Sequence, residues 1–224
     1  MARRIDPSLI PAAPTLEYET AFWAQGLVRV AGIDEAGRGA LAGPVYAAAV
    51  VLPGDASIAK TLQGVRDSKE MSIEQREQWA AVIRETVADW GVGQATTEEI
   101  DAYGIMTATR WAAMRALAQL NSAADHLLID ALNLPEIATP QTRLYKGDQR
   151  CLCIAAASVL AKVARDAELC ALDQDFPRYG FAQHKGYATR GHRQAIRLAG
   201  PSPIHRMSFA LLGDELAAPE QADA

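Results

Sequence analysis

VAGIDEAGRGALAG, residues 30–43, joins an apolar segment to two adjacent acids and a glycine-rich turn. Residues 27–33 are apolar and partly β-branched, so they predict a strand that delivers Asp34 and Glu35 onto the turn. Successive side chains of a strand point to opposite faces, so the two acids share a face only if the backbone bends. The glycines of the segment Gly37–Gly39 tolerate such a bend.

The acid pair at the end of this strand favours a divalent cation. Buried carboxylates are costly unless something compensates their charge, and hard divalent cations prefer carboxylate oxygens. Two other interpretations stay open: Asp34 and Glu35 could be solvated loop residues, or the Gly-x-Gly could belong to a dinucleotide loop. The dinucleotide interpretation is weak because its third glycine is missing and the acids precede the glycines.

Composition indicates one main domain without a membrane anchor. The chain has 224 residues, half of them hydrophobic, which is enough for a sizeable core. The longest weakly polar run, residues 40–53, contains a Gly-Pro pair and is shorter than the roughly 20 residues of a membrane helix. The N-terminus lacks the apolar stretch of a secretion signal. We expect a soluble, cytoplasmic protein that is monomeric.

The three cysteines, Cys151, Cys153 and Cys170, predict neither disulfides nor a metal site. They are not an even set, and no second Cys or His pair stands at zinc-ligand spacing. We therefore expect reduced, packed thiols.

Charge is distributed unevenly along the chain. The net charge is -5, which by itself argues against a nucleic-acid partner. Residues 176–210, however, contain six of the Lys and Arg residues, three of the four histidines and no acid. Such a block can contact a phosphate backbone, although a solvated basic helix face would look the same.

A second strand is expected to end at an acid, and a third is expected to lead to one beside a glycine turn. Residues 125–130, DHLLID, form a short apolar strand whose last residue is Asp130, and residues 142–145 lead into Lys146-Gly147-Asp148. Ligands gather beyond the carboxyl ends of strands in such sheets, so two such ends can place Asp34 and Asp130 side by side. Asp148 could instead be an ordinary turn residue.

The remaining signals indicate an α/β domain with a mixed central sheet flanked by helices. Ser72 and Gln75 form a capping box before a helix, and Thr189 can cap another. The expected strands are 27–33, 45–52, 90–95, 125–130 and 142–145, and the expected helices are 72–88, 105–120, 151–172 and 190–199, with a short one around 18–23.

Seven sequence blocks occur here in the order in which they occur in ribonuclease HII, the type 2 ribonuclease H. They are GIDEAGRGALAGPV, DSKEMS, LLID, KGD, AASVLAKVARD, YGFAQHKGY and HRMSF, and they span residues 30–209. The resemblance implies an RNase H-like fold with a C-terminal helical extension. It divides the chain into an arm (1–26), a catalytic domain (27–175), the extension (176–212) and a frayed acidic tail (213–224).

The activity implied by the resemblance is endonucleolytic hydrolysis of RNA in RNA–DNA hybrids. It includes cutting on the 5′ side of single ribonucleotides in duplex DNA, which leaves 3′-hydroxyl and 5′-phosphate ends and serves ribonucleotide excision and primer removal. By matching blocks, the catalytic residues and ligands of two Mg²⁺ or Mn²⁺ ions are Asp34, Glu35, Asp130 and Asp148. Two ions about 3.5–4 Å apart suit an in-line displacement at phosphorus.

The resemblance also implies substrate contacts. Gly37, Arg38 and Gly39 would contact the ribose 2′-OH at the RNA-to-DNA junction, and Tyr187 would stack on the next sugar. Tyr187 could instead be a core aromatic, but the flanking Lys185 and Gly186 argue against burial. Candidates for phosphate contacts, or else ordinary surface charges, are Lys69, Lys146, His184, Lys185 and Arg206. Ser158 and Lys162 are four residues apart on one face of a helix, so they are expected either to contact the substrate or to stabilise the site.

Two positions depart from the family pattern. Ala40 stands where proline is common, and Ala131 follows Asp130 where glycine is usual. An alanine is expected to keep the backbone out of the left-handed region. The alternatives to a nuclease are a sugar-kinase-like phosphotransferase, for which a second phosphate loop is missing, and a non-catalytic hybrid-binding module. The expected partners are RNA–DNA hybrid and ribonucleotide-containing duplex DNA, and a sliding-clamp partner is unknown.

Overall fold

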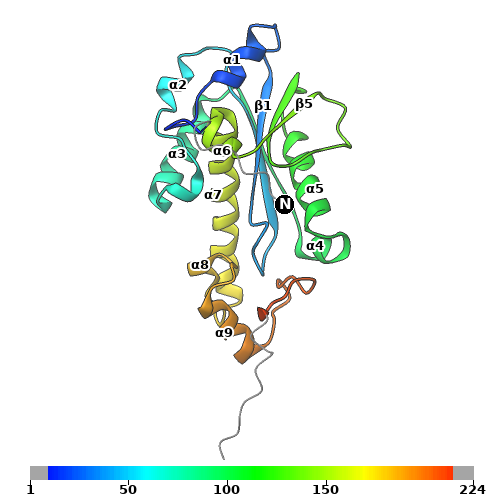
Figure 1. Cartoon of the computed structure of the whole chain (residues 1–224). Coiled ribbons are helices and arrows are strands. Elements are labelled where there is room, and N and C mark those ends of the chain that lie inside the picture. Colours follow the sequence, from blue (N-terminus) through cyan, green and yellow to red (C-terminus); the bar gives the residue numbers. More distant parts are fainter. Residues whose placement is uncertain (1–9, 214–224) are drawn as a thin grey trace, which may run out of the picture.

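A computed structural model describes residues 10–213 and contains a mixed five-stranded sheet in the order β3-β2-β1-β4-β5 (Figure 1). The strands are β1 (Val30–Ala36), β2 (Val45–Val51), β3 (Asp89–Ala95), β4 (His126–Asp130) and β5 (Gln141–Leu144). β1 is central: it pairs antiparallel with β2 and parallel with β4. The predicted mixed α/β architecture is confirmed.

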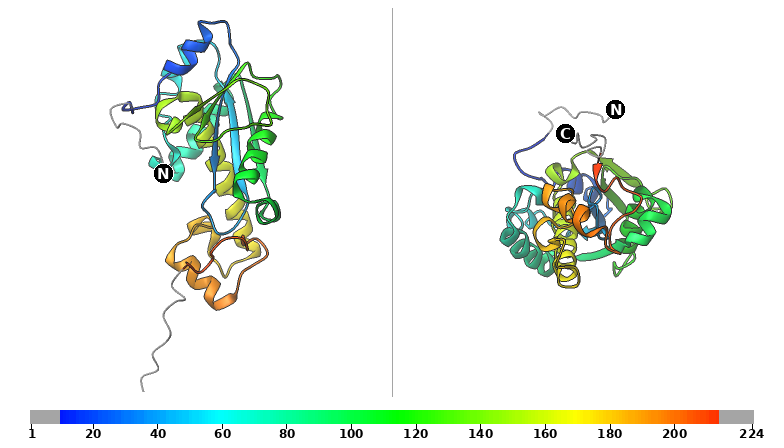
Figure 2. Two further views of the ribbon diagram at one scale, coloured as in Figure 1. Left: turned by 45° about the vertical axis from the view of Figure 1, so that its right-hand side comes forward. Right: turned by 90° about the horizontal axis from the view of Figure 1, so that it is seen from below.

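Helices cover both faces of the sheet, as Figure 2 shows. α7 (Leu152–Asp175) and α3 (Ile73–Thr86) lie on one face, and α4 (Thr97–Tyr103) and α5 (Ile105–Leu117) lie on the other. Alternate residues of β1 serve the two cores: Val30 is buried on the α7 side, and Ile33 on the α5 side. Because both faces are covered, the strand is apolar from Val30 to Ile33, before the two acids, as expected of a buried central strand.

The smaller helices lie around this frame. They are α1 (Glu17–Trp23), α2 (Ile58–Thr61), the 3₁₀ helix η2 (Ser68–Glu70), α6 (Gly147–Arg150), α8 (Phe181–His184) and α9 (Arg190–Ala199). α8 and α9 pack at the far end of α7, away from α1 and α6 (Figure 1). The predicted division into arm, domain, extension and tail stays a prediction, and residues 1–9 and 214–224 of its arm and tail lie outside the described residues.

Local capping signals predicted the helix starts well. Ser72 Oγ accepts from Gln75 N, and the Gln75 side chain accepts from Ser72 N, as the capping-box pattern indicates. Thr189 caps α9 through His192 N. A second capping box, formed by Thr96 and Glu99, begins α4. This helix was not predicted from the sequence.

Three expectations were wrong in detail. β1 continues through Ala36, so both acids lie inside the strand and not on the turn. Ala131 adopts φ +45°, in the left-handed region that we expected an alanine to avoid. Its N–H donates to Leu144 O at 2.8 Å, and this strand contact holds the strained backbone. Cys151 and Cys153 are buried free thiols, but Cys170 is exposed.

In the described part of the chain, no helix combines the length and hydropathy that crossing a bilayer demands.

Candidate active site

Asp34 and Glu35 are consecutive residues of β1, opposite Ala48 and Ala47 of β2. The ladder continues to Ala36, so the backbone does not bend between the acids. Asp34 is only 5% exposed, and its Oδ1 accepts from Glu35 N at 2.8 Å. Glu35 is held by Arg38, whose Nη1 lies 2.9 Å from Glu35 Oε1. Burial of Asp34 within a strand rules out the solvated-loop interpretation.

Asp130 reaches the same edge of the sheet from β4. β4 runs parallel to β1, and the last paired residues, Ile33 and Ile129, directly precede Asp34 and Asp130. Asp130 Oδ1 accepts from Gly147 N at 2.7 Å, which ties this carboxylate to the start of α6.

Asp148, in the first turn of α6, is the fourth acid and is 4% exposed. Its neighbour Gly147 has no room for a side chain, because a Cβ there would come within 2.7 Å of Ile154 Cδ1 and 3.3 Å of Asp130 Oδ1. The glycine before the acid therefore permits the close approach of α6 to Asp130.

The four acids form one electrostatic cluster. Burial raises the pKa of Asp34 well above its usual value, and repulsion from Glu35, Asp130 and Asp148 raises it further. Burial likewise raises the pKa of Asp130 to about 6, against the lowering effect of Gly147 N–H. The pKa of Asp148 is raised by burial as well. Carboxylates crowded in this way fit divalent cations, which would offset both the burial and the repulsion.

Lys69 of η2 partly balances this charge. Its Nζ lies 3.2 Å from Asp148 Oδ2 and 3.6 Å from Asp67 Oδ1, while its side chain is 75% exposed. Partial burial would lower the pKa of Lys69, but Asp148, Asp67 and Asp34 outweigh this effect and raise it. Asp67 fixes the approach of η2 to α6, since it caps Lys69 N and accepts from Gln149 Nε2 at 3.1 Å.

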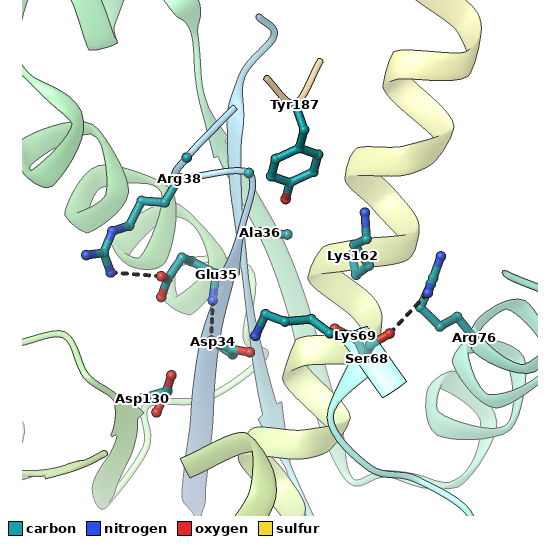
Figure 3. A pocket seen from close by; sticks show the side chains of 12 residues that line it. Asp34, Glu35, Ala36, Arg38, Ser68, Lys69, Arg76, Asp130, Lys162 and Tyr187 are labelled. Atoms are coloured by element: carbon teal, nitrogen blue, oxygen red, sulfur yellow. Dashed lines mark hydrogen bonds and ion pairs between the residues drawn. The ribbon is translucent and has the colours of Figure 1, made fainter. Parts of the chain in front are cut away.

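A cavity of about 540 Å³ opens over Asp34, Glu35 and Asp130, whereas Asp148 is not part of its lining. Figure 3 shows Asp34, Glu35 and Asp130 on one side together with Arg38, which pairs with Glu35; Lys162 and Arg76 lie on the other side, Lys69 lies between, and Tyr187 lies above Ala36. The residues that line the cavity are Asp34, Glu35, Ala36, Gly37, Arg38, Gly39, Ser68, Lys69, Arg76, Asp130, Lys162 and Tyr187. The structure thus brings the predicted strand-end acids together with the Gly-Arg-Gly segment and Tyr187.

Arg76 and Asp166 were missed by the sequence reading. Asp166 Oδ1 lies 2.6 Å from Lys162 Nζ, and its Oδ2 lies 3.4 Å from Arg76 Nη2. Burial lowers the pKa of Lys162 even though Asp166 faces it. The spacing of Lys162 and Asp166 on one helix could have revealed their pair, whereas nothing in the sequence places Arg76 beside them.

Two buried arginines hold the loop that carries the Gly-Arg-Gly segment. Arg165 donates to the carbonyls of Pro44, Ala42 and Lys185 at 2.9–3.1 Å. Arg206 donates to those of Gly43, Arg38 and Ala40 at 2.8–3.0 Å. Both side chains are 0% exposed. Arg206 is therefore not on the surface where the sequence reading placed it.

Tyr187 is half-buried, with its ring 5.4 Å from Lys162 Nζ and 5.2 Å from Arg165 Cζ. Contrary to expectation, its neighbours Lys185 and Gly186 are both buried. Lys185 Nζ donates to Ala182 O, so its ammonium is used inside the fold. Tyr187 nevertheless lines the cavity.

The other candidates do not line the cavity. Ser158 is buried, donates to Ala155 O at 2.9 Å and accepts from Ser68 N at 3.4 Å, so it braces η2. His184 contacts Tyr179 O at 2.7 Å and accepts from Gly186 N. Lys146 is exposed, at φ +53°.

Comparisons with known proteins identify the family of the chain. Residues 31–212 match the family model described as Ribonuclease HII. Ribonuclease HII of Synechococcus sp. (strain JA-3-3Ab) is 49% identical over 201 residues, which cover 90% of each chain. Ribonuclease HII of Moorella thermoacetica is 50% identical over 192 residues, covering 86% of this chain and 91% of that protein.

Solved structures agree in fold. Ribonuclease H2 from Pyrococcus horikoshii OT3 superposes with a TM-score of 0.68 at 25% identity, covering 82% of this chain and 95% of the other. RNase HII from Archaeoglobus fulgidus, solved in a complex with PCNA, gives 0.67 at 29% identity, covering 80% and 92%. The family match over most of the chain and the high identity to these relatives lead to one conclusion: the chain belongs to the ribonuclease HII family, the type 2 ribonuclease H endonucleases that act on RNA–DNA hybrids.

Proposed function

We propose that this chain cuts the RNA strand of hybrids, and the 5′ side of single ribonucleotides in duplex DNA, with two divalent cations held by Asp34, Glu35, Asp130 and Asp148. The observation that carries the proposal is the convergence of four carboxylates, three of them with raised pKa values, beside a cavity. A buried anionic cluster of this kind is costly without cations. The oxygen-only donor set favours Mg²⁺ or Mn²⁺.

The chain's own carboxylates would hold the cations and in this way position the reacting phosphate. When bound, the divalent ions supply Lewis-acid chemistry that activates the attacking water and stabilises charge on the leaving 3′ oxygen. Asp34 and Asp130 are fixed by the N–H groups of Glu35 and Gly147. Those bonds restrict each carboxylate to one orientation, which preorganises the site before substrate arrives.

Recognition of the ribonucleotide is assigned to the Gly37–Gly39 segment and Tyr187. A Cβ on Gly39 would meet nothing within 4 Å, so the space beside this backbone is open to a sugar. A 2′-OH can both donate and accept a hydrogen bond, and exposed backbone groups can serve it in both roles. Tyr187, supported by Arg165 and Lys162, would present its ring to the adjoining sugar.

Lys69, Lys162 and Arg76 form the basic side of the cavity and are the proposed phosphate contacts within it. Lys146 is exposed and could contact the duplex farther out. For Lys185, Arg206, His184 and Ser158 we propose supporting roles, because their polar groups bond within the fold.

The activity would serve ribonucleotide excision and primer removal, because its products carry a 3′-hydroxyl and a 5′-phosphate. The Archaeoglobus fulgidus relative was solved with PCNA, which makes a sliding clamp a candidate partner for this chain too.

The test uses a DNA duplex with one ribonucleotide, a duplex with an all-RNA strand, and an all-DNA duplex as the control. Wild-type protein with Mg²⁺ or Mn²⁺ should cut the first on the 5′ side of the ribonucleotide, cut the second, and leave the third intact. Tyr187→Ala should lose most cleavage at the single ribonucleotide. Cutting of the all-RNA strand alone by the wild type would leave the metal proposal standing and refute the junction assignment.

A further inference from the structure

A second group of side chains that could hold a metal ion lies at the start of α7. Glu19 of α1 meets Cys151 and Cys153 at the start of α7, and their ligand atoms all lie within 4.8 Å of one another. The two Sγ atoms are 3.4 Å apart, and Cys151 Sγ lies 3.4 Å from Glu19 Oε1. All three side chains are fully buried. Cysteine spacing alone could not reveal this cluster, because Glu19 is far away in the sequence.

Glu19 has an unused ligand atom. Its Oε1 accepts from Cys153 N at 2.8 Å, but Oε2 is buried without a hydrogen-bond partner among residues 10–213. A buried carboxyl oxygen left unpaired costs free energy that a bound cation would recover. Burial also raises the pKa of Glu19 and of both thiols, so their ionised forms need a compensating charge.

We propose that Glu19, Cys151 and Cys153 form a buried site for a thiophilic divalent cation of the Zn²⁺ type. Tetrahedral zinc with its usual bond lengths separates a sulfur and an oxygen ligand by about 3.5 Å and two sulfurs by about 3.8 Å. The observed separations are within a few tenths of an ångström of these values. Glu19 Oε2 is available as a fourth donor if the carboxylate binds through both oxygens.

The site would fasten α1 to the elements that carry the catalytic acids. Thr15 N donates to Arg150 O at 3.1 Å, and Leu152 N donates to Thr15 O at 3.0 Å, so the chain before α1 already flanks Cys151. Asp148 precedes Cys151 by three residues.

The other cysteine contacts the central strand. A Cβ on Gly32 of β1 would come within 2.5 Å of Cys153 Sγ, and Gly32 stands two residues before Asp34. A cation here would therefore stabilise the backbone segments that carry Asp34 and Asp148. It would not contact the substrate.

Co²⁺ is the probe, because thiolate ligands give it a charge-transfer band in the near ultraviolet that carboxylates do not. The full chain is refolded from denaturant with reductant and Co²⁺, so that entry into a buried site does not limit loading. Dialysis against excess Mg²⁺ then removes Co²⁺ from the active-site carboxylates. The expected result is one retained Co²⁺ per chain together with the thiolate band.

Cys153→Ser should lose at least half of the band, because only the Cys151 thiolate remains, and Glu19→Gln should weaken Co²⁺ binding by more than about tenfold. Cys170→Ser is the matched control, because Cys170 is an exposed thiol outside the cluster, and it should keep the band. Asp34→Asn should keep it too, which separates this site from the active site.

Absence of the band from refolded wild type with a native circular-dichroism spectrum would overturn the proposal, as would an undiminished band in Cys153→Ser. If Cys153→Ser does not fold, X-ray absorption at the cobalt edge of the wild type identifies the atoms bound to the cobalt. Two sulfur neighbours support the site, and a shell of oxygen and nitrogen alone refutes it.

Discussion

The guanidinium group of Arg165 fills the space in which a side chain on Gly37 would lie: a Cβ on Gly37 would stand 1.8 Å from Arg165 Nε. Gly37 also adopts φ +91°, a conformation that L side chains rarely accept. The turn after the two strand acids therefore depends on an arginine of α7, more than a hundred residues later in the chain.

Gly37→Ala should lower both stability and cleavage. The positive φ alone costs roughly 1–2 kcal/mol, and displacement of the buried Arg165 adds to it. Thermal unfolding and cleavage of a hybrid measure the two effects. Gly39→Ala is the control for folding, because a Cβ there meets nothing within 4 Å, and its melting temperature should stay closer to that of the wild type. Equal melting temperatures for Gly37→Ala and the wild type would contradict the account.

Arg206→Lys should destabilise the protein although it keeps the charge. The guanidinium group of Arg206 donates to the carbonyls of Arg38, Ala40 and Gly43, and a single lysine ammonium cannot reach all three. Each buried carbonyl left without a donor costs about 1–3 kcal/mol. Chemical denaturation measures this loss. Exposed Lys146→Ala is the comparison and should change stability little.

The salt dependence of hybrid binding tests the same assignment of Arg206. Because Arg206 is buried, the slope of log affinity against log salt should be unchanged in the folded variant. A flatter slope would indicate a phosphate contact at Arg206 and contradict the bracing role.

Ala131→Gly should raise the free energy of unfolding by about 1 kcal/mol. Ala131 sits at φ +45°, where glycine carries no steric penalty. Ala118→Gly is the control, since Ala118 has φ −67° and should lose stability when replaced. If both variants were destabilised to the same extent, the strain at Ala131 would be refuted.

Lys69→Ala should move the acid limb of the pH–activity profile to higher pH at subsaturating Mg²⁺. The ammonium of Lys69 lowers the pKa of Asp148 and of Asp130, so its removal raises both. A higher pKa keeps the carboxylates protonated to a higher pH, and protonated carboxyls do not bind the cation. Lys69→Arg should keep the wild-type profile. A shift to lower pH in Lys69→Ala would contradict the sign of this effect.

The acids at the strand ends and the starts of helices could be predicted from the sequence, because both patterns involve residues that are close together in the chain. The predicted ends of two strands identified Asp34 and Asp130 as candidates, and residues 72–75 alone were enough to predict the Ser72 capping box. Resemblance to a family added Asp148 as a ligand and Tyr187 as a substrate contact. These assignments remain proposals, supported for Tyr187 by the cavity that it shares with Asp34 and Asp130 and for Asp148 by its charge repulsion with those two acids.

The sequence could not reveal which charged residues are buried. Arg206 lies in a basic block typical of a surface, yet it serves carbonyls of a loop more than 160 residues earlier. Ala131 is a small residue whose positive φ is imposed by pairing with Leu144. Glu19 meets two cysteines only because the fold brings α1 to the first residues of α7. Each of these relationships arises from tertiary packing, which no short window of sequence contains.

The most direct test of the account compares cleavage and binding by the wild type and Asp130→Asn, on one duplex with a single ribonucleotide. With Mg²⁺, the wild type should cut on the 5′ side of the ribonucleotide and should not cut in EDTA. Asp130→Asn should bind the duplex with similar affinity but cut it at least about a hundredfold more slowly. Wild-type cleavage that survives EDTA, or an undiminished rate in Asp130→Asn, would contradict a catalytic centre built from these four acids.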